Sequence, residues 1–198
     1  MINGPQELHP FETFFPPDTT RLILGSIPPF RFTRGPGEKV KEDGDFPFYY
    51  GSRYNLFWKL LGEVFQEPLT DINAIQALLL KQKIGIADIV KQCTRKQKKG
   101  KPSAADADLR VKQWHTELRE ILETPSLRKI LFTSRWVHDN FKRHIGAHPE
   151  LEKAILISPS PAANMHIGSL AAYKQLKTEN PAYTPNDFRL ARYREAFQ

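Results

Sequence analysis

The chain has 198 residues, a length that suits one domain of ordinary size with a buried core. Hydrophobic residues make up 40% of it and aromatic residues 11%, which excludes a largely disordered chain. No apolar run approaches the length of a membrane span, and the first ten residues lack the basic and apolar regions of a secretory signal. The one cysteine, Cys93, excludes an intrachain disulfide. We therefore expect a single domain, residues 1–198, in the cytoplasm.

The net charge is +7, from 29 Lys and Arg against 22 Asp and Glu. A surface of this sign attracts polyanions, of which nucleic acid is the commonest in a cytoplasm. Many small proteins are basic for solubility alone, so the charge permits nucleic-acid binding without proving it. One cysteine excludes a four-cysteine zinc site, and no histidine pairs with a carboxylate at metal-ligand spacing. We expect neither a metal nor a cofactor.

Four short apolar runs predict buried strands, at residues 21–27, 84–90, 129–133 and 154–158. Helices are predicted at residues 55–65, after Asp71, from Val111 to Leu122, from Ser134 to about residue 146, at 169–177 and at 184–197. The Gly- and Pro-rich segment 30–47 predicts a long loop, and residues 91–101, with six Lys or Arg and no acid, predict a mobile basic loop.

Continuous apolar strands separated by helices are typical of a parallel sheet that helices cover on both faces. The predicted fold is therefore α/β, a three-layer αβα sandwich with a central four-stranded parallel sheet. Ligand sites in such folds gather at the carboxyl ends of the strands. This rule selects the loops after Leu24, Ile89, Phe132 and Ile157.

Three motifs occur in or near these loops. The first strand leads into Gly-Ser-Ile-Pro at residues 25–28, residues 49–58 read Tyr-Tyr-Gly-Ser-Arg-Tyr-Asn-Leu-Phe-Trp, and residues 158–164 read Ser-Pro-Ser-Pro-Ala-Ala-Asn. Each motif alone is weak. Together and in this order they resemble the uracil-DNA glycosylase superfamily, which places Gly-x-x-Pro after its first strand and a Ser-Pro-rich loop after its last. The second and third motifs are most similar to the hypoxanthine-DNA glycosylase branch.

The resemblance implies a monofunctional DNA glycosylase that hydrolyses the N-glycosidic bond of deaminated bases, hypoxanthine or uracil, in base-excision repair. Its partner would be DNA that contains damaged bases, away from any membrane, and we expect it to act as a monomer. The alternative is a non-catalytic DNA-binding relative of the same fold. Two departures from the family pattern lie beside the proposed site: the segment 30–47 is long, and Ser52-Arg53-Tyr54 replaces a run that usually contains His-Pro.

The resemblance assigns handling of the flipped base to Gly25, Ser26, Tyr50 and Asp88. An aromatic ring at position 50 could stack on the base, whereas we expect Phe57 and Trp58 to pack in the core. The carboxylate of Asp88 could accept a hydrogen bond from an N–H on the edge of the base. Equally, it could cap backbone or form a salt bridge with Lys91 or Arg95.

The resemblance to the hypoxanthine branch implies that Asn55 serves in water activation, and Ile27 occupies the position where many superfamily members have Asp or Asn. An amide cannot act as a general base, but its carbonyl oxygen could position a water molecule. The structural alternative is that Asn55 satisfies backbone groups in the first turn of its helix, after Ser52 as a cap.

The resemblance also implies contacts to the DNA backbone, from short hydroxyl and amide side chains of the last motif and from lysines. They are Ser158, Ser160, Asn164, Lys96, Lys98 and Lys99. The lysines belong to the charged segment 91–101, which could instead be a solvated loop with no contact to DNA.

Overall fold

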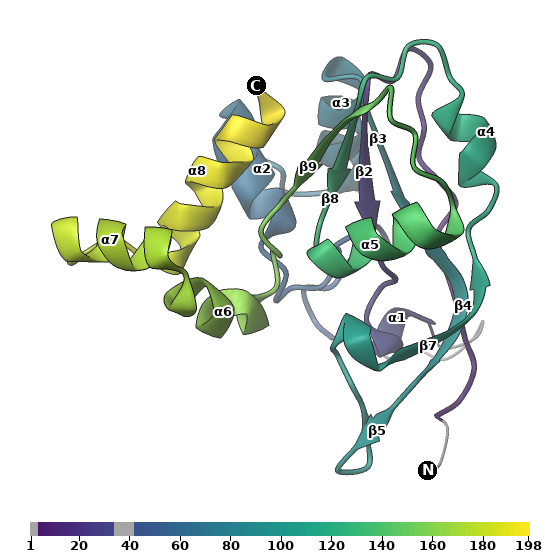
Figure 1. Ribbon diagram of the computed structural model, residues 1–198, viewed down its shortest axis with the longest axis horizontal. Coiled ribbons are helices and arrows are strands. Elements are labelled where there is room, and N and C mark those ends of the chain that lie inside the picture. The colour runs from purple at the N-terminus through teal and green to yellow at the C-terminus, as the bar shows by residue number, and fades with distance from the viewer. Residues whose placement is uncertain (1–3, 34–41) are drawn as a thin grey trace.

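The computed structural model describes residues 4–33 and 42–198 of the chain. At its centre lies a four-stranded parallel sheet in the order β3-β2-β8-β9 (Figure 1). Its strands are β2 (Arg21–Gly25), β3 (Ile84–Asp88), β8 (Lys129–Phe132) and β9 (Glu152–Ile155). The predicted α/β fold is confirmed, although the last strand lies earlier in the chain than the predicted 154–158.

Alternating side chains of the strands build a core on each face of this sheet. Leu22 and Leu24 pack in a cluster with residues of α4 (Leu118–Leu122) and α5 (Arg135–His144). Ile23 points the other way, into a cluster with α2 (Phe57–Phe65), α3 (Ile72–Lys81) and α8 (Pro185–Phe197). In Figure 1, α5 crosses the front of the sheet, α3 lies behind it, and α2 lies to its left behind α8. Burial on both faces explains why the strands are continuously apolar.

Helix caps follow the sequence closely. The side chain of Asp71 accepts a hydrogen bond from the backbone N–H of Ala74, and that of Ser134 accepts one from Val137. At the start of α8, Thr184 and Asp187 form a reciprocal capping box. Helix α2 begins two residues later than predicted. Its first two residues, Phe57 and Trp58, are buried in the core as expected.

The prediction of a mobile basic loop at residues 91–101 is wrong. This segment forms most of β4 (Val90–Arg95), then β5 (Gln97–Lys98) and the start of β6 (Lys101–Pro102). The charge run was misleading because Arg95 is only 3% exposed and pairs with Glu7, a residue far away in sequence. Lys99 and Gly100 both have positive φ and form the tight turn of the β5–β6 hairpin.

The prediction of one helix from Val111 to Leu122 is wrong in its first half. Residues 109–114 form strand β7 (Leu109–Trp114), which pairs antiparallel with β4. Burial along β7 alternates at first, with Leu109 and Val111 packed against the core and Arg110 and Lys112 exposed. This period of two is typical of a strand. β1 (Glu7–Leu8) completes this second sheet on the other edge of β4.

The remaining segments differ in detail from the prediction. Within the predicted loop 30–47, residues 30–33 form a short helix, α1 (Phe30–Thr33), and residues 34–41 lie outside the described part of the chain. The predicted helix 169–177 corresponds to α7 (Ala171–Glu179), and a short helix that was not predicted, α6 (Asn164–Ser169), precedes it. In the described ranges, no helix is long and apolar enough to cross a membrane.

Candidate active site

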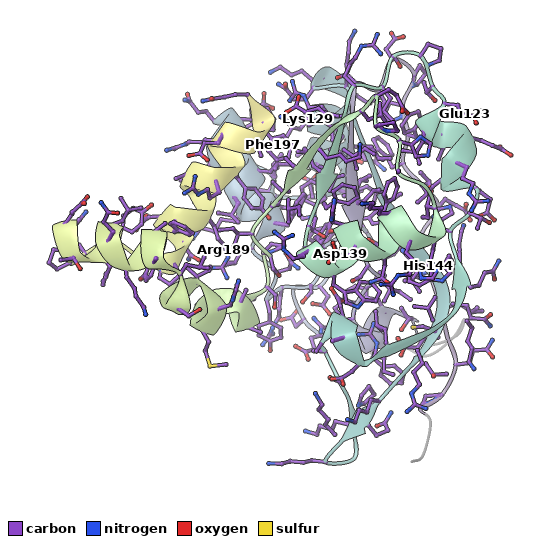
Figure 2. All side chains as sticks on the ribbon, in the orientation of Figure 1. Glu123, Lys129, Asp139, His144, Arg189 and Phe197 are labelled. Carbon is purple, nitrogen blue, oxygen red and sulfur yellow. The ribbon has the colours of Figure 1, made fainter. Side chains whose placement is uncertain are left out.

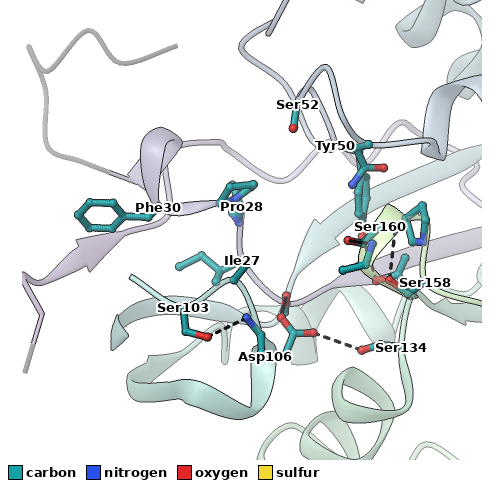
Figure 3. A pocket seen from close by; sticks show the side chains of 18 of the residues that line it. Ile27, Pro28, Phe30, Tyr50, Ser52, Ser103, Asp106, Ser134, Ser158 and Ser160 are labelled. Carbon is teal, nitrogen blue, oxygen red and sulfur yellow. Dashed lines mark hydrogen bonds between the residues drawn. The ribbon is translucent and has the colours of Figure 1, made fainter. Parts of the chain in front are cut away.

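A cavity of about 820 Å³ opens at the carboxyl ends of the central strands (Figure 3). The loops that follow β2, β8 and β9 contribute to it, as do the last residue of β3 and the segment between β6 and β7. Of the predicted site residues, those that line the cavity are Ser26, Tyr50, Asn55, Asp88, Ser158 and Ser160. The volume lies within the range of roughly 300–1,000 Å³ that is usual for small-molecule sites.

Gly25 lies directly beneath two of these side chains. It pairs in register with Asp88 at the ends of β2 and β3. A Cβ atom at position 25 would lie 2.2 Å from Asp88 Oδ1 and 2.3 Å from Tyr50 Oη, closer than real side chains allow. Glycine is therefore needed so that the carboxylate and the phenol can meet over the end of β2.

Asp88 is 4% exposed, and its side chain pairs with a residue that was not predicted. Its Oδ2 atom lies 2.9 Å from Nε2 of His9, which belongs to the N-terminal segment. This contact replaces the predicted alternative of a salt bridge with Lys91 or Arg95. Because 79 residues separate His9 from Asp88, no local pattern in the sequence could have indicated the pair.

Behind this pair, Nδ1 of His115 donates to the backbone carbonyl oxygen of Asp88 at 2.9 Å. Burial lowers the pKa of His115, which favours the neutral imidazole. The backbone at the end of β3 is thus held by a side chain that does not line the cavity.

Tyr50 is fixed in a conformation that directs it over the sheet. Its φ of 53° lies in the left-handed region. One face of its ring stacks on Phe57, with 4.3 Å between the ring centroids and an angle of 25° between the planes. Its hydroxyl donates to Oγ1 of Thr133 at 3.0 Å, and burial raises the pKa of Tyr50 well above its ordinary value. The ring is therefore a rigid, neutral aromatic surface at the cavity wall.

Ile27 and Asn55 both line the cavity. Ile27 is 7% exposed and presents only an apolar side chain. Asn55 Oδ1 accepts a hydrogen bond from the backbone N–H of Phe57 at 2.9 Å, which is the bond that the structural alternative predicts. An amide oxygen has a second lone pair, so this bond leaves one acceptor position on Asn55. Ser52 is not the cap of α2, because its hydroxyl contacts Arg31 and the Tyr54 backbone.

A second carboxyl group, that of Asp106, lines the cavity and was not predicted. It lies in the turn η1 (Asp106–Asp108), which connects β6 to β7. Its oxygens accept from the hydroxyl of Ser26 at 2.7 Å and, more weakly, from that of Ser134 at 3.5 Å (Figure 3). Burial raises the pKa of Asp106. The sequence did not predict this position of Asp106, because η1 lies between two segments whose structure was predicted wrongly, residues 91–101 and the first half of residues 111–122.

The Ser-Pro loop is held in place by Arg189 of α8, which is fully buried (Figure 2). Its guanidinium group donates to the carbonyl oxygens of Ser158 and Ser160, each at 2.9 Å, and to Oδ1 of Asn186 at 3.0 Å. Burial lowers the pKa of Arg189, but an arginine stays protonated in such a site. The loop hydroxyls accept from backbone N–H groups of the loop itself, which leaves their own hydrogens free to donate.

The other predicted DNA contacts lie outside the cavity lining in the described part of the chain. Asn164 is exposed at the start of α6, next to lining residues of the loop. Lys96, Lys98 and Lys99 are exposed on the β5–β6 hairpin, which projects away from the central sheet in Figure 1. Lys98 pairs with Asp108. Among the described residues, no three His, Cys, Asp or Glu side chains gather as metal ligands.

A solved structure has a similar fold. A candidate uracil DNA glycosylase from Methanosarcina acetivorans, solved by NMR, superimposes with a TM-score of 0.51 over 89% of this chain and 93% of that one, at 24% identity. The sheet and its flanking helices are thus those of the uracil-DNA glycosylase fold.

The sequence comparison is more specific. A hypoxanthine DNA glycosylase from Methanosarcina barkeri is 31% identical over 133 residues, which cover 61% of this chain and 70% of the relative. No model of a known protein family matches the chain. The chain belongs to the hypoxanthine-DNA glycosylase branch of the uracil-DNA glycosylase superfamily.

Proposed function

We propose that this protein is a monofunctional DNA glycosylase that removes hypoxanthine or uracil from DNA by hydrolysis, as a step of base-excision repair. The observation that carries the proposal is the cavity at the sheet edge, where an aromatic ring, an acceptor for the base edge and polar loops for the backbone converge. A base cannot be reached inside a duplex, so a glycosylase must flip it into such a pocket.

The walls of the cavity suit a flipped base. Phe57 covers one face of Tyr50, so the other face is the one that a base can stack on. Stacking of this kind contributes about 1–3 kcal/mol per base. Asp88 can accept from an N–H group on the edge of hypoxanthine or uracil, and its pairing with His9 fixes the carboxylate for that contact. Ser26, at the end of β2, completes this side of the pocket.

The sugar and phosphates would then lie against the Ser-Pro loop. Hydroxyl and backbone groups of Ser158 and Ser160 can donate to phosphate oxygens, and Asn164 extends this surface outward. The three hairpin lysines would bind phosphates further along the DNA. As C1′ gains positive charge during bond cleavage, the cavity must hold a water molecule near it. The free acceptor position of Asn55 is suited to orient that water.

The proposal is tested by base release from matched duplexes that contain hypoxanthine, uracil, xanthine or only normal bases. We expect free hypoxanthine or uracil and an abasic strand that stays intact until alkali is added, because a monofunctional glycosylase does not cleave the sugar–phosphate backbone. Release from none of the duplexes at high enzyme and low salt would leave the alternative, a non-catalytic DNA-binding relative.

Asn55→Ala tests the water-positioning role and has a matched control. We expect single-turnover excision to fall about 100-fold or more, the effect of losing the position of a reacting group. Asn180 makes the same local bond as Asn55, with its Oδ1 accepting from the backbone N–H of Ala182, but it lies outside the cavity lining. Asn180→Ala should therefore leave the rate unchanged. Equal rates for both variants and the wild type would show that Asn55 only caps α2.

A further inference from the structure

The cavity lacks a proton acceptor at the position where related enzymes have one. Ile27 fills that position, and Asn55 can hold water but cannot take up a proton. A carboxyl group nevertheless reaches the same cavity from another part of the chain. Asp106 enters from the segment between β6 and β7, and in Figure 3 its carboxyl group lies between Ile27 and Ser134.

The neighbours of Asp106 orient its carboxyl group. The Ser26 hydroxyl donates to Oδ1 at 2.7 Å, so this bond ties Asp106 to the end of β2. The Ser134 hydroxyl, which itself accepts from Val137 as the cap of α5, lies 3.5 Å from Oδ2. A carboxylate offers about four acceptor positions, so these two contacts leave acceptor capacity toward the cavity. Neither contact is an ion pair.

We propose that Asp106 is the catalytic general base of this site, which takes a proton from the attacking water in place of the residue that Ile27 has replaced. The inference rests on the proposed glycosylase function. In this step the water oxygen bonds to C1′ of the deoxyribose, while the bond from C1′ to the base nitrogen breaks and its electron pair leaves with the base. One water proton passes to the Asp106 carboxylate, and the departing base gains a proton from solvent.

The electrostatic surroundings suit this role. Asp88, Arg95 and Tyr50 interact electrostatically with Asp106, and the other charged residues that line the cavity are Arg31, Glu42 and Lys101. Burial raises the pKa of Asp106 and Asp88 raises it further, while the Ser26 hydrogen bond and Arg95 lower it. A base whose pKa lies nearer the working pH is the more effective proton acceptor. Once ionised, the carboxylate also stabilises the positive charge that develops on the sugar.

Asp106→Asn tests the inference under single-turnover conditions with enzyme in excess. Asparagine keeps the oxygen that Ser26 donates to, so a purely structural role would be preserved. We expect excision to fall about 100- to 10,000-fold, the usual contribution of general acid–base catalysis. The matched control is Asp108→Asn, in the same turn, which changes the charge equally. Asp108 itself does not line the cavity, and its carboxylate is bound by Lys98 and by the hydroxyl of Ser103. The control variant should stay within about threefold of the wild type, well below that effect.

The pH profile provides a second readout. The wild-type rate should rise with pH as Asp106 ionises and then level off, and Asp106→Asn should lose this rise. Ser26→Ala removes a hydrogen bond that lowers the pKa of Asp106, so its rise in rate should move to higher pH. This variant keeps Asp106, so it also decides the matter if Asp106→Asn fails to fold.

The two hypotheses fail differently. A wild-type protein that releases no base from any duplex would overturn the proposed function and this inference with it. A wild-type protein that releases base, while Asp106→Asn keeps both the rate and the pH profile, would overturn the inference alone. An unshifted profile in Ser26→Ala would also count against Asp106 as the base.

Discussion

Two buried arginines hold opposite parts of the cavity wall, and they differ in how their charge is balanced. Arg95 of β4 donates to both carboxylate oxygens of Glu7, at 2.9 and 3.0 Å, and to the carbonyl oxygen of Pro28 at 2.7 Å. Arg189 of α8 donates to carbonyl and amide oxygens, with no carboxylate among its hydrogen-bond partners in the described ranges. One wall therefore depends on an ion pair and the other on backbone dipoles.

The difference shows what each wall can tolerate. In the Arg95 wall, one side chain connects three segments that are distant in sequence. Arg95 itself belongs to β4, its ion pair with Glu7 reaches β1, and its hydrogen bond to Pro28 reaches the loop after β2. Because both charges are buried, loss of either leaves the other uncompensated. The Arg189 wall has no anion that could be stranded, so a change there frees carbonyl groups rather than a charge. We expect the first wall to control folding and the second to control the shape of the Ser-Pro loop.

Glu7→Ala should give the largest effect. It leaves the Arg95 guanidinium buried without the carboxylate that pairs with it and also removes one of the two acceptors of the Thr33 hydroxyl. The free energy of unfolding should fall by about 3–5 kcal/mol, as for other broken buried pairs. Urea denaturation measures this. Glu195→Ala, which breaks the exposed pair with Arg192, is the control and should cost less than about 1 kcal/mol. Similar losses for the two variants would remove the distinction between the walls.

Arg189→Ala should have an intermediate effect on stability and a clear effect on DNA. Leaving the Ser158 and Ser160 carbonyl oxygens without their donor costs about 1–3 kcal/mol. The loosened loop should also bind DNA more weakly, as measured by fluorescence anisotropy. Arg189→Lys should recover only part of both losses, since an ammonium group cannot donate to two carbonyl groups in a fixed fork. Full recovery by lysine would mean that charge, not geometry, holds the loop.

Replacing Lys96, Lys98 and Lys99 together by Ala should have the smallest effect on folding. These side chains belong to the segment 91–101, like Arg95, but they are exposed, so the unfolding midpoint should not change. If they bind phosphates, the slope of log affinity against log salt should fall by about 0.9 for each phosphate that the variant no longer binds. An unchanged slope would show that the hairpin is solvated and does not contact DNA.

The sequence predicted what depends on local patterns. Four apolar runs predicted the central sheet, and the caps at Asp71, Ser134 and Thr184 predicted where helices begin. The motifs after the first and last strands also led to residues that meet in one cavity.

The features that the sequence did not predict depend on contacts between distant residues. Arg95 looked like part of a solvated charge run because its partner, Glu7, is 88 residues away. The sequence predicts a helix in place of β7 because Val111, Trp114 and Leu118 fall at helical spacing, although the first two belong to the strand and Leu118 begins α4. Asp106 was missed for the same reason, since only the second sheet brings it back to Ser26.

The central claim is that this cavity releases a deaminated base from DNA. The most direct test is chromatographic detection of the free base after incubation of excess wild-type protein with a hypoxanthine duplex, a uracil duplex and a normal duplex of the same sequence. The account predicts stoichiometric release of hypoxanthine or uracil and none of a normal base. Tight, salt-sensitive binding to all three duplexes with no base released from any would contradict it.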